Sequence, residues 1–216
     1  MRRHLRLVLA GALVLGGSSL AAAQGRQIGL KAGASVATLH PEASQISGEP
    51  LEPRAGLTAG AFAVFPLQSR LAIQLEALFT DKGGTQAVPD PTILRGVLLD
   101  RLRFHYLDVP VLLRVSGPQA GSARLHGFIG PTLSVRLGAK YESALSASGS
   151  WGTEYDIAQD TRRFDAGLTV GGGAEFGPRL VLDARYTLGL ADVLEEQLGT
   201  PVTNRGFLVT VGVRIF

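Results

Sequence analysis

Twelve charged side chains recur at alternate positions of otherwise apolar segments, and they carry the clearest chemical potential in this sequence. Alternate residues of a β-strand share a face, so these side chains are expected opposite the apolar face. Seven are basic and five are acidic. Opposite charges enclosed together form ion pairs, so we predict a buried charge network that fills an interior. Its members are Lys31, Glu76, Asp108, Arg114, Arg124, Arg136, Arg163, Asp165, Glu175, Asp183, Arg185 and Arg214.

The sequence pattern contains no catalytic or metal-binding arrangement. Three histidines follow residue 23, namely His40, His105 and His126. The nearest serine on the face of His126 is Ser134, about 26 Å along a strand, which excludes a Ser-His-acid set there. The chain has no cysteine and its histidines are scattered, so no metal cluster is predicted. We expect a non-enzymatic protein with no catalytic, cofactor-binding or metal site, and no cofactor.

Residues 106–115 and 125–137 predict the hairpin around which the chain is organised. Leu107 to Val115 places an aliphatic side chain at every second position, and the intervening face includes Asp108 and Arg114. The second strand repeats this division, and its apolar face runs for seven positions without a charge. Such a face is typical of a strand in contact with lipid. We interpret the hairpin as two strands of a membrane barrel.

Six further segments alternate in the same way, which brings the expected number of strands to eight. Their ranges are 27–39, 54–65, 70–80, 162–176, 180–190 and 205–216. The facing of residues 54–65 stays open, and 93–99 fits either a short helix or a strand extension. Short and long connections alternate, as in outer-membrane barrels. The sequence therefore predicts an all-β fold, an eight-stranded antiparallel up-and-down transmembrane β-barrel. The long connections are 40–53, 81–101, 141–161 and 191–204.

Aromatic residues near the strand ends support a membrane barrel. Phe164 and Phe176 lie on one face, separated by about 30 Å along the membrane normal, as in two interfacial girdles. At the C-terminus, the apolar face ends at Ile215, and Phe216 falls one residue out of phase. Either Ile215 occupies the aromatic position or a β-bulge resets the register.

Phe104-His-Tyr-Leu-Asp-Val-Pro-Val-Leu-Leu-Arg114, followed by Phe128-Ile-Gly-Pro131, resembles the signature hairpin of the PorT-like outer-membrane β-barrel family. The resemblance implies an eight-stranded barrel in the outer membrane of a Gram-negative bacterium, and some relatives are associated with protein secretion. Pro110 and Pro131 each remove a ladder donor. They lie almost equidistant from the turn near Gln119, so we interpret them as one local bulge in which the two prolines face each other. The resemblance also implies a proline at each place.

The N-terminus has the organisation of a secretory signal peptide. Arg2, Arg3 and Arg6 precede an apolar run, and residues 21–23 are small. We predict residues 1–23 as the signal peptide and 24–216 as the barrel domain. Of the 21 basic residues, three would leave with the signal, so 18 would balance the 18 acidic residues. A neutral mature chain does not indicate a nucleic-acid partner.

These features predict a monomer exported to the outer membrane of a Gram-negative bacterium. Its expected partners are outer-membrane lipid, the barrel-assembly machinery through the C-terminal strand, and an unknown protein or surface ligand at the external loops. The predicted role is structural, binding or secretion-accessory. Two alternatives stay open: a narrow passive, porin-like channel, and a soluble lipocalin-like barrel with its apolar face turned inward around a ligand.

Overall fold

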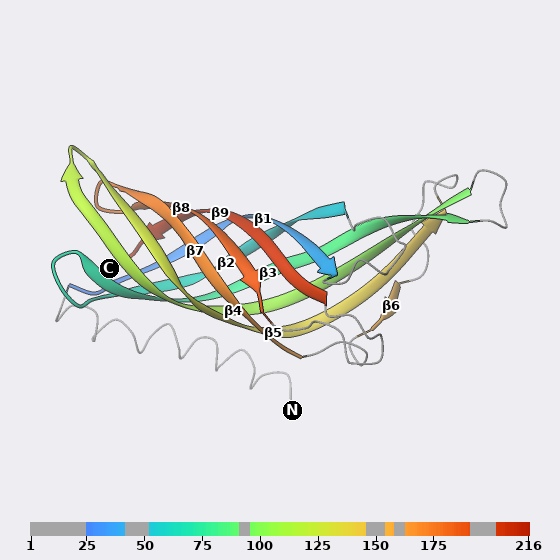
Figure 1. Ribbon diagram of the computed structural model, residues 1–216. Helices are drawn as coiled ribbons and strands as arrows, with labels where there is room; N and C mark the ends of the chain where they lie inside the picture. The colour runs from blue at the N-terminus through green and yellow to red at the C-terminus, as the bar shows by residue number, and fades with distance from the viewer. Residues whose placement is uncertain (1–24, 42–51, 91–95, 146–153, 158–162, 191–201) are drawn as a thin grey trace, which may run out of the picture.

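The computed structural model describes residues 25–41, 52–90, 96–145, 154–157, 163–190 and 202–216 (Figure 1). Eight strands in these ranges close a barrel, and the short β6 pairs only with β5. No helix among the described residues is long and apolar enough to cross a bilayer. The strands are β1 (Gln27–Pro41), β2 (Glu52–Pro66), β3 (Leu71–Asp90), β4 (Gly96–Ala120), β5 (Ala123–Leu145), β6 (Glu154–Asp156), β7 (Phe164–Phe176), β8 (Leu180–Gly189) and β9 (Val202–Arg214).

Every barrel strand pairs antiparallel with its neighbours in the sequence, and β1 pairs with β9 to close the ring. The predicted all-β, eight-stranded antiparallel barrel is confirmed. Closure leaves no unpaired sheet edge around the membrane-facing wall.

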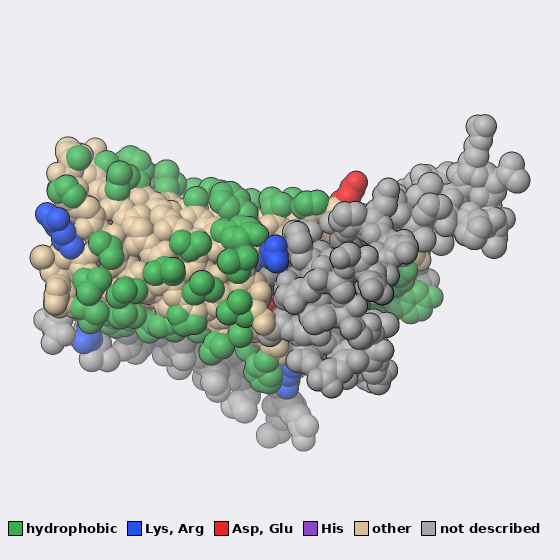
Figure 2. Space-filling view, in the orientation of Figure 1, with side chains coloured by type: hydrophobic (Ala, Val, Ile, Leu, Met, Phe, Trp, Pro, Cys, Tyr) green, Lys and Arg blue, Asp and Glu red, His purple; other side chains and the backbone are tan. Residues whose placement is uncertain are grey.

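The predicted alternation of faces is also confirmed. Apolar side chains such as Leu133, Val170 and Val211 are half exposed on the outer wall, whereas polar ones such as Gln74 and Thr80 are buried inside. Residues 54–65 follow the same rule, with Leu57 outside and Phe62 inside. Figure 2 shows hydrophobic side chains spread over the visible face of the barrel, and we call the apolar outer wall the apolar band. This arrangement is opposite to the lipocalin-like alternative, which needs its apolar face inside.

The two ends of the barrel differ in how far their strands extend. At one end, which we call the turn end, short turns join β2 to β3, β4 to β5 and β7 to β8. Gly121 and Gly177 in two of these turns adopt φ angles of 61° and 56°, which glycine accepts without strain. At the other end, β3, β4, β5 and β6 continue as a sheet beyond the remaining strands (Figure 1). We call this part the tall sheet.

Most of the expected connection 81–101 is strand in the structure. β3 and β4 remain paired from Thr80 and Tyr106 as far as Asp90 and Gly96, so residues 96–99 belong to a strand extension. Part of the expected connection 141–161 is also strand, because residues 141–145 pair with β4 and residues 154–156 pair with β5. The expected signal peptide at 1–23 and most of the connections 40–53 and 191–204 lie outside the described residues.

The interpretation of the two prolines as a bulge is wrong. Pro110 pairs with Thr132 in the same register as Leu113 with Ile129, so no residue is inserted between them. The β4–β5 register shifts lie instead between His105 and Tyr106 and between Ser116 and Gln119. Pro110 points inward and Pro131 outward, so the two rings do not face each other.

The C-terminus ends in a bulge-like pairing. The amides of both Ile215 and Phe216 donate to the carbonyl oxygen of Ile28, at 2.7 and 3.3 Å. Two residues opposite one is the arrangement of a β-bulge, and both side chains are exposed on the outer wall. Of the two sequence alternatives, the structure favours the bulge.

Candidate functional site

An ion-pair cluster from β1, β3 and β8 crosses the lumen at mid-height. Lys31 Nζ lies 2.8 Å from Glu76 Oε1 and 2.6 Å from Asp183 Oδ2. Arg185 donates hydrogen bonds of 2.7 and 3.0 Å to the two oxygens of Glu76. β3 and β8 are four strands apart in the ring of eight, so the pair between Glu76 and Arg185 spans the lumen.

The cluster continues toward the turn end through β4, β7 and β9. Arg114 donates to Gln74 Oε1 at 2.9 Å and also forms an ion pair with Glu175. Gln74 in turn donates to Glu76 at 2.5 Å. Arg214 lies 3.2 Å from Glu175, so this carboxylate is shared by two guanidinium groups. These contacts join the walls of the lower lumen to the central cluster.

His126 on β5 is part of this cluster. Its Nε2 atom lies 2.8 Å from Asp183 Oδ1, and both side chains are fully enclosed. Gly173 on β7 makes room for the contact, because a Cβ atom there would come within 2.8 Å of His126 Nε2 and closer still to Asp183 Oδ1. No serine or threonine hydroxyl is bonded to His126 among the described residues. The histidine therefore holds the Asp183 carboxylate in position.

Aromatic side chains line the lumen beside the cations. Lys31 Nζ lies 4.7 Å from the ring centroid of Phe62, and the Arg185 guanidinium 5.1 Å from that of Phe128. Cation–π contacts of this kind stabilise desolvated cations. The predicted lumen network did not include either ring, although each occupies an inward position of its strand.

A second polar cluster lies in the lumen toward the tall sheet. Lys82 Nζ lies 3.0 Å from Asp108 Oδ1, and Ser134 Oγ donates to the same oxygen at 2.5 Å. Asp165 is also buried, and among the described residues its Oδ1 atom has no hydrogen-bond partner. A cavity of about 20 Å³ adjoins these side chains and has room for one water molecule. Lys82 was missed because it falls in the expected connection 81–101.

The remaining residues of the predicted network occupy other positions. Arg136 is buried in the lumen wall. Arg124 lies at the turn end, where it donates to the carbonyl oxygens of Gly117 and Ser69. The prediction that Arg163 belongs to the lumen network is wrong, because its side chain is exposed. Its guanidinium lies 6.0 Å from the ring of Phe164. β7 begins at residue 164, so the period-two pattern does not extend to residue 163.

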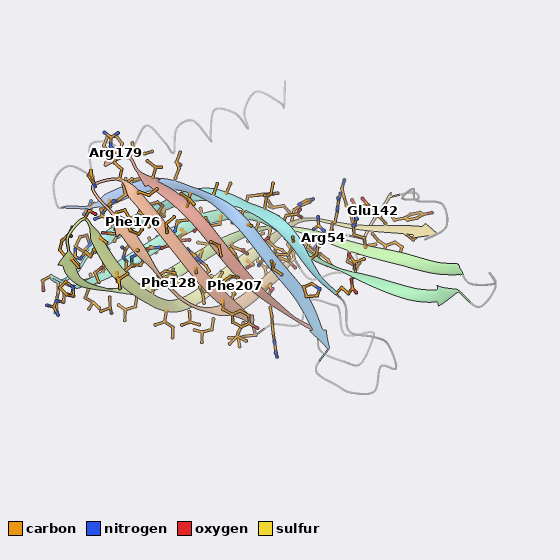
Figure 3. All side chains as sticks on the ribbon, turned by 90° about the horizontal axis from the view of Figure 1, so that it is seen from above. Arg54, Phe128, Glu142, Phe176, Arg179 and Phe207 are labelled. Atoms are coloured by element: carbon orange, nitrogen blue, oxygen red, sulfur yellow. The ribbon has the colours of Figure 1, made fainter. Side chains whose placement is uncertain are left out.

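The outer face of the tall sheet carries charges of both signs. Arg54 lies 3.1 Å from Asp81, and Glu142 lies 3.5 Å from Arg101 and 3.4 Å from Arg103. Burial lowers the pKa of Arg101, and the neighbouring positive charge of Arg103 lowers it further. Arg54 and Glu142 lie along the tall sheet in Figure 3. This face is a charged surface set apart from the apolar band.

The arrangement of the lumen is that of a packed plug. Glu76, Asp183 and Arg185 are each at most 2% exposed at their side chains, and each contacts an opposite charge. Within the described ranges, no three His, Cys, Asp or Glu side chains gather in a way that would hold a metal ion. The chemistry that this geometry supports is electrostatic cross-linking of the barrel walls.

Comparison with known proteins agrees with this fold. A family model described as "Outer membrane protein beta-barrel domain" matches residues 22–195. No curated protein matches the chain. Among solved structures, OprG from Pseudomonas aeruginosa is similar at 12% identity and a TM-score of 0.50, over 89% of this chain and 96% of that one. Neisserial surface protein A is 14% identical with a TM-score of 0.48, over 86% and 96%. At this identity, the similarity to OprG shows the fold alone.

Proposed function

This chain belongs to the outer membrane protein beta-barrel domain family, and on that premise we propose that it holds the tall sheet outside the cell as a binding platform. In this proposal the barrel is an anchor in the outer membrane. Its lumen neither conducts solutes nor catalyses a reaction. The role is therefore structural or binding.

The height of the tall sheet is the observation that carries the proposal. β7 begins at Phe164, opposite Val135, whereas β5 continues to Leu145. The part of β5 beyond Val135, residues 136–145, corresponds to roughly 33 Å of strand at about 3.3 Å per residue. The inner face of the sheet has its own small core of Phe104, Tyr106 and Ala139. A platform ordered in this way presents a partner with a preformed surface, which lowers the entropic cost of binding.

The filled lumen supports the absence of a pore. Eight strands enclose a space just wide enough for side chains, and here ion pairs span it. Any solute path would have to break buried charge pairs, which is costly. The same packing leaves His126 bound to Asp183 and supports a non-enzymatic role.

The finer assignments from the sequence remain part of the proposal. The hairpin resemblance supports a PorT-like member, and with it a secretion-accessory role. The turn end would face the periplasm, as short turns do in barrels of this kind. The protein would act as a monomer in a Gram-negative outer membrane, after cleavage of residues 1–23.

Site-specific photo-crosslinking on intact cells tests the platform. Tyr155 on β6 is 57% exposed and Tyr186 on β8 is 38% exposed, so each is replaced in turn by a photoreactive phenylalanine. The proposal predicts discrete protein adducts from position 155. Position 186 lies in the apolar band and should give lipid adducts only. Equal adducts from both positions, or none from position 155, would contradict the platform.

A further inference from the structure

The turn end of the lumen contains a cavity of about 60 Å³. A water molecule needs about 10–15 Å³ of such a cavity, so this one has room for several waters or one small oxyanion. Its charged lining consists of Arg70, Arg114, Arg124 and Glu175. The rest of the wall is partly polar, from Gln27, Gln68, Ser69 and Ser116, and partly apolar, from Val64, Pro66, Leu71 and Ala72.

The charge balance of this cavity is positive. Three arginines line it against one carboxylate, and Glu175 is already shared by Arg114 and Arg214. Arg124 is held by two backbone carbonyl oxygens, which fix its guanidinium without neutralising it. The cavity therefore keeps uncompensated positive charge in an oriented form.

Arg70 lies at the rim of the cavity. It is exposed in the turn between β2 and β3, and its guanidinium makes no hydrogen bond or ion pair with the described residues. The floor is the opposite case, because Arg114 is 2% exposed and held by Gln74 and Glu175. A guanidinium presents several donors in a planar fork that matches the oxygens of a phosphate group.

The surroundings reinforce this preference for anions. Arg70 and Arg179 lie in two of the three turns at this end, Arg124 lies at the start of β5, and the turns carry no acidic residue. Figure 2 shows Lys and Arg side chains at this end of the barrel. A positive rim attracts anions toward the mouth and raises their rate of encounter.

We propose that this cavity is a binding site for a phosphate group, with Arg114 as its floor and Arg70 and Arg124 as its walls. The group enters from the aqueous side of the turn end, either as a free anion or as part of a phospholipid headgroup. The site lies at the end of the barrel opposite the tall sheet. This proposal therefore does not depend on the proposed platform.

Titration of the refolded full chain in zwitterionic detergent tests the site. Inorganic phosphate is added while the arginine Nε–Hε NMR signals are followed, against sodium chloride at matched ionic strength. We expect saturable shifts with phosphate only. Arg70→Ala should weaken binding by about tenfold, as expected for loss of one charge-assisted contact.

Arg179→Ala is the matched control, because Arg179 is an exposed arginine on a neighbouring turn and does not line the cavity (Figure 3). It should bind phosphate like the unmodified chain. Arg114 is left intact because its buried contacts support the barrel. Equal weakening by the two substitutions, or shifts that sodium chloride reproduces, would overturn the proposal.

A second titration identifies the source of the phosphate group. The protein is placed in nanodiscs of phosphatidylcholine with or without phosphatidic acid. If headgroups occupy the site, phosphatidic acid shifts the same arginine signals and competes with free phosphate. If the ligand is a soluble anion, free phosphate binds equally in both. Absence of saturable binding in both membranes would also overturn the site.

Discussion

Glu76 and Arg185 face each other from opposite walls of the barrel and are joined by two hydrogen bonds of 2.7 and 3.0 Å. Their side chains are 0% and 2% exposed. In most small proteins the core that joins distant strands is apolar, but here many of the apolar side chains lie on the outer wall. The ion pairs therefore share the role of the core with the apolar side chains buried in the lumen, such as Phe62, Leu78 and Leu112, and they close the lumen by the same contact.

Removal of one partner of this pair should strongly destabilise the barrel. Arg185→Met leaves Glu76 and Asp183 as buried carboxylates with less compensation, and such changes cost about 3–5 kcal/mol. Urea unfolding in micelles measures the loss. Arg163→Met is the control, and it should change stability by at most about 0.5 kcal/mol because Arg163 is exposed. Similar effects of both changes would contradict the network.

Gly173→Ala should disturb the contact between His126 and Asp183. The added Cβ atom would collide with the backbone carbonyl oxygen of Leu182 and with the Asp183 carboxylate, and it would approach His126 Nε2 to 2.8 Å. Overpacking of this kind costs roughly 1–3 kcal/mol. Gly127→Ala is a matched control, since the nearest atom to its Cβ would be 3.8 Å away. Thermal unfolding of the two variants gives the comparison. A stable Gly173→Ala variant would mean that the contact is dispensable.

A charge on the outer wall should cost most at the middle of the apolar band. Val170 lies midway along β7 and is 46% exposed, whereas Phe176 lies at the strand end. Arginine costs about 2–4 kcal/mol at the bilayer midplane and roughly 0–1 kcal/mol near the interface. We expect this difference between Val170→Arg and Phe176→Arg when folding into lipid vesicles is titrated with urea. Equal costs would place the membrane elsewhere.

Deletion of Phe216 should affect assembly in cells more than stability. Its backbone makes one end of the bulge-like pairing with Ile28, and few other described contacts depend on it. If the assembly machinery reads the terminal aromatic residue, the folded band should decrease in outer-membrane fractions. Refolding of the purified chain should be nearly unchanged. A parallel loss in both assays would indicate a structural role instead.

The fold was predictable because one physical rule governs most of the chain. Lipid outside and side-chain packing inside force period-two alternation, which is visible directly in segments such as 71–80. The tall sheet was foreseen only as one of two alternatives for residues 93–99, because Gly83, Gly84 and Pro89 suggest a loop. Backbone pairing between β3 and β4 overrides these signals in the structure.

The partners within the charge network were less predictable than its members. Alternation places Glu76 and Arg185 inside, but the stagger between distant strands decides which inward residues meet. The sequence does not reveal this stagger. Arg163 was misplaced for a local reason, since the alternation stops where β7 begins.

Single-channel recording in planar bilayers tests the central claim most directly. The claim is that ion pairs close the lumen and leave the barrel as an anchor for the tall sheet. We predict no resolved openings from the refolded full chain in concentrated potassium chloride, even at high applied voltage. Steady, ohmic openings from the unmodified protein would contradict the account, because they would require a continuous water path past Glu76 and Arg185.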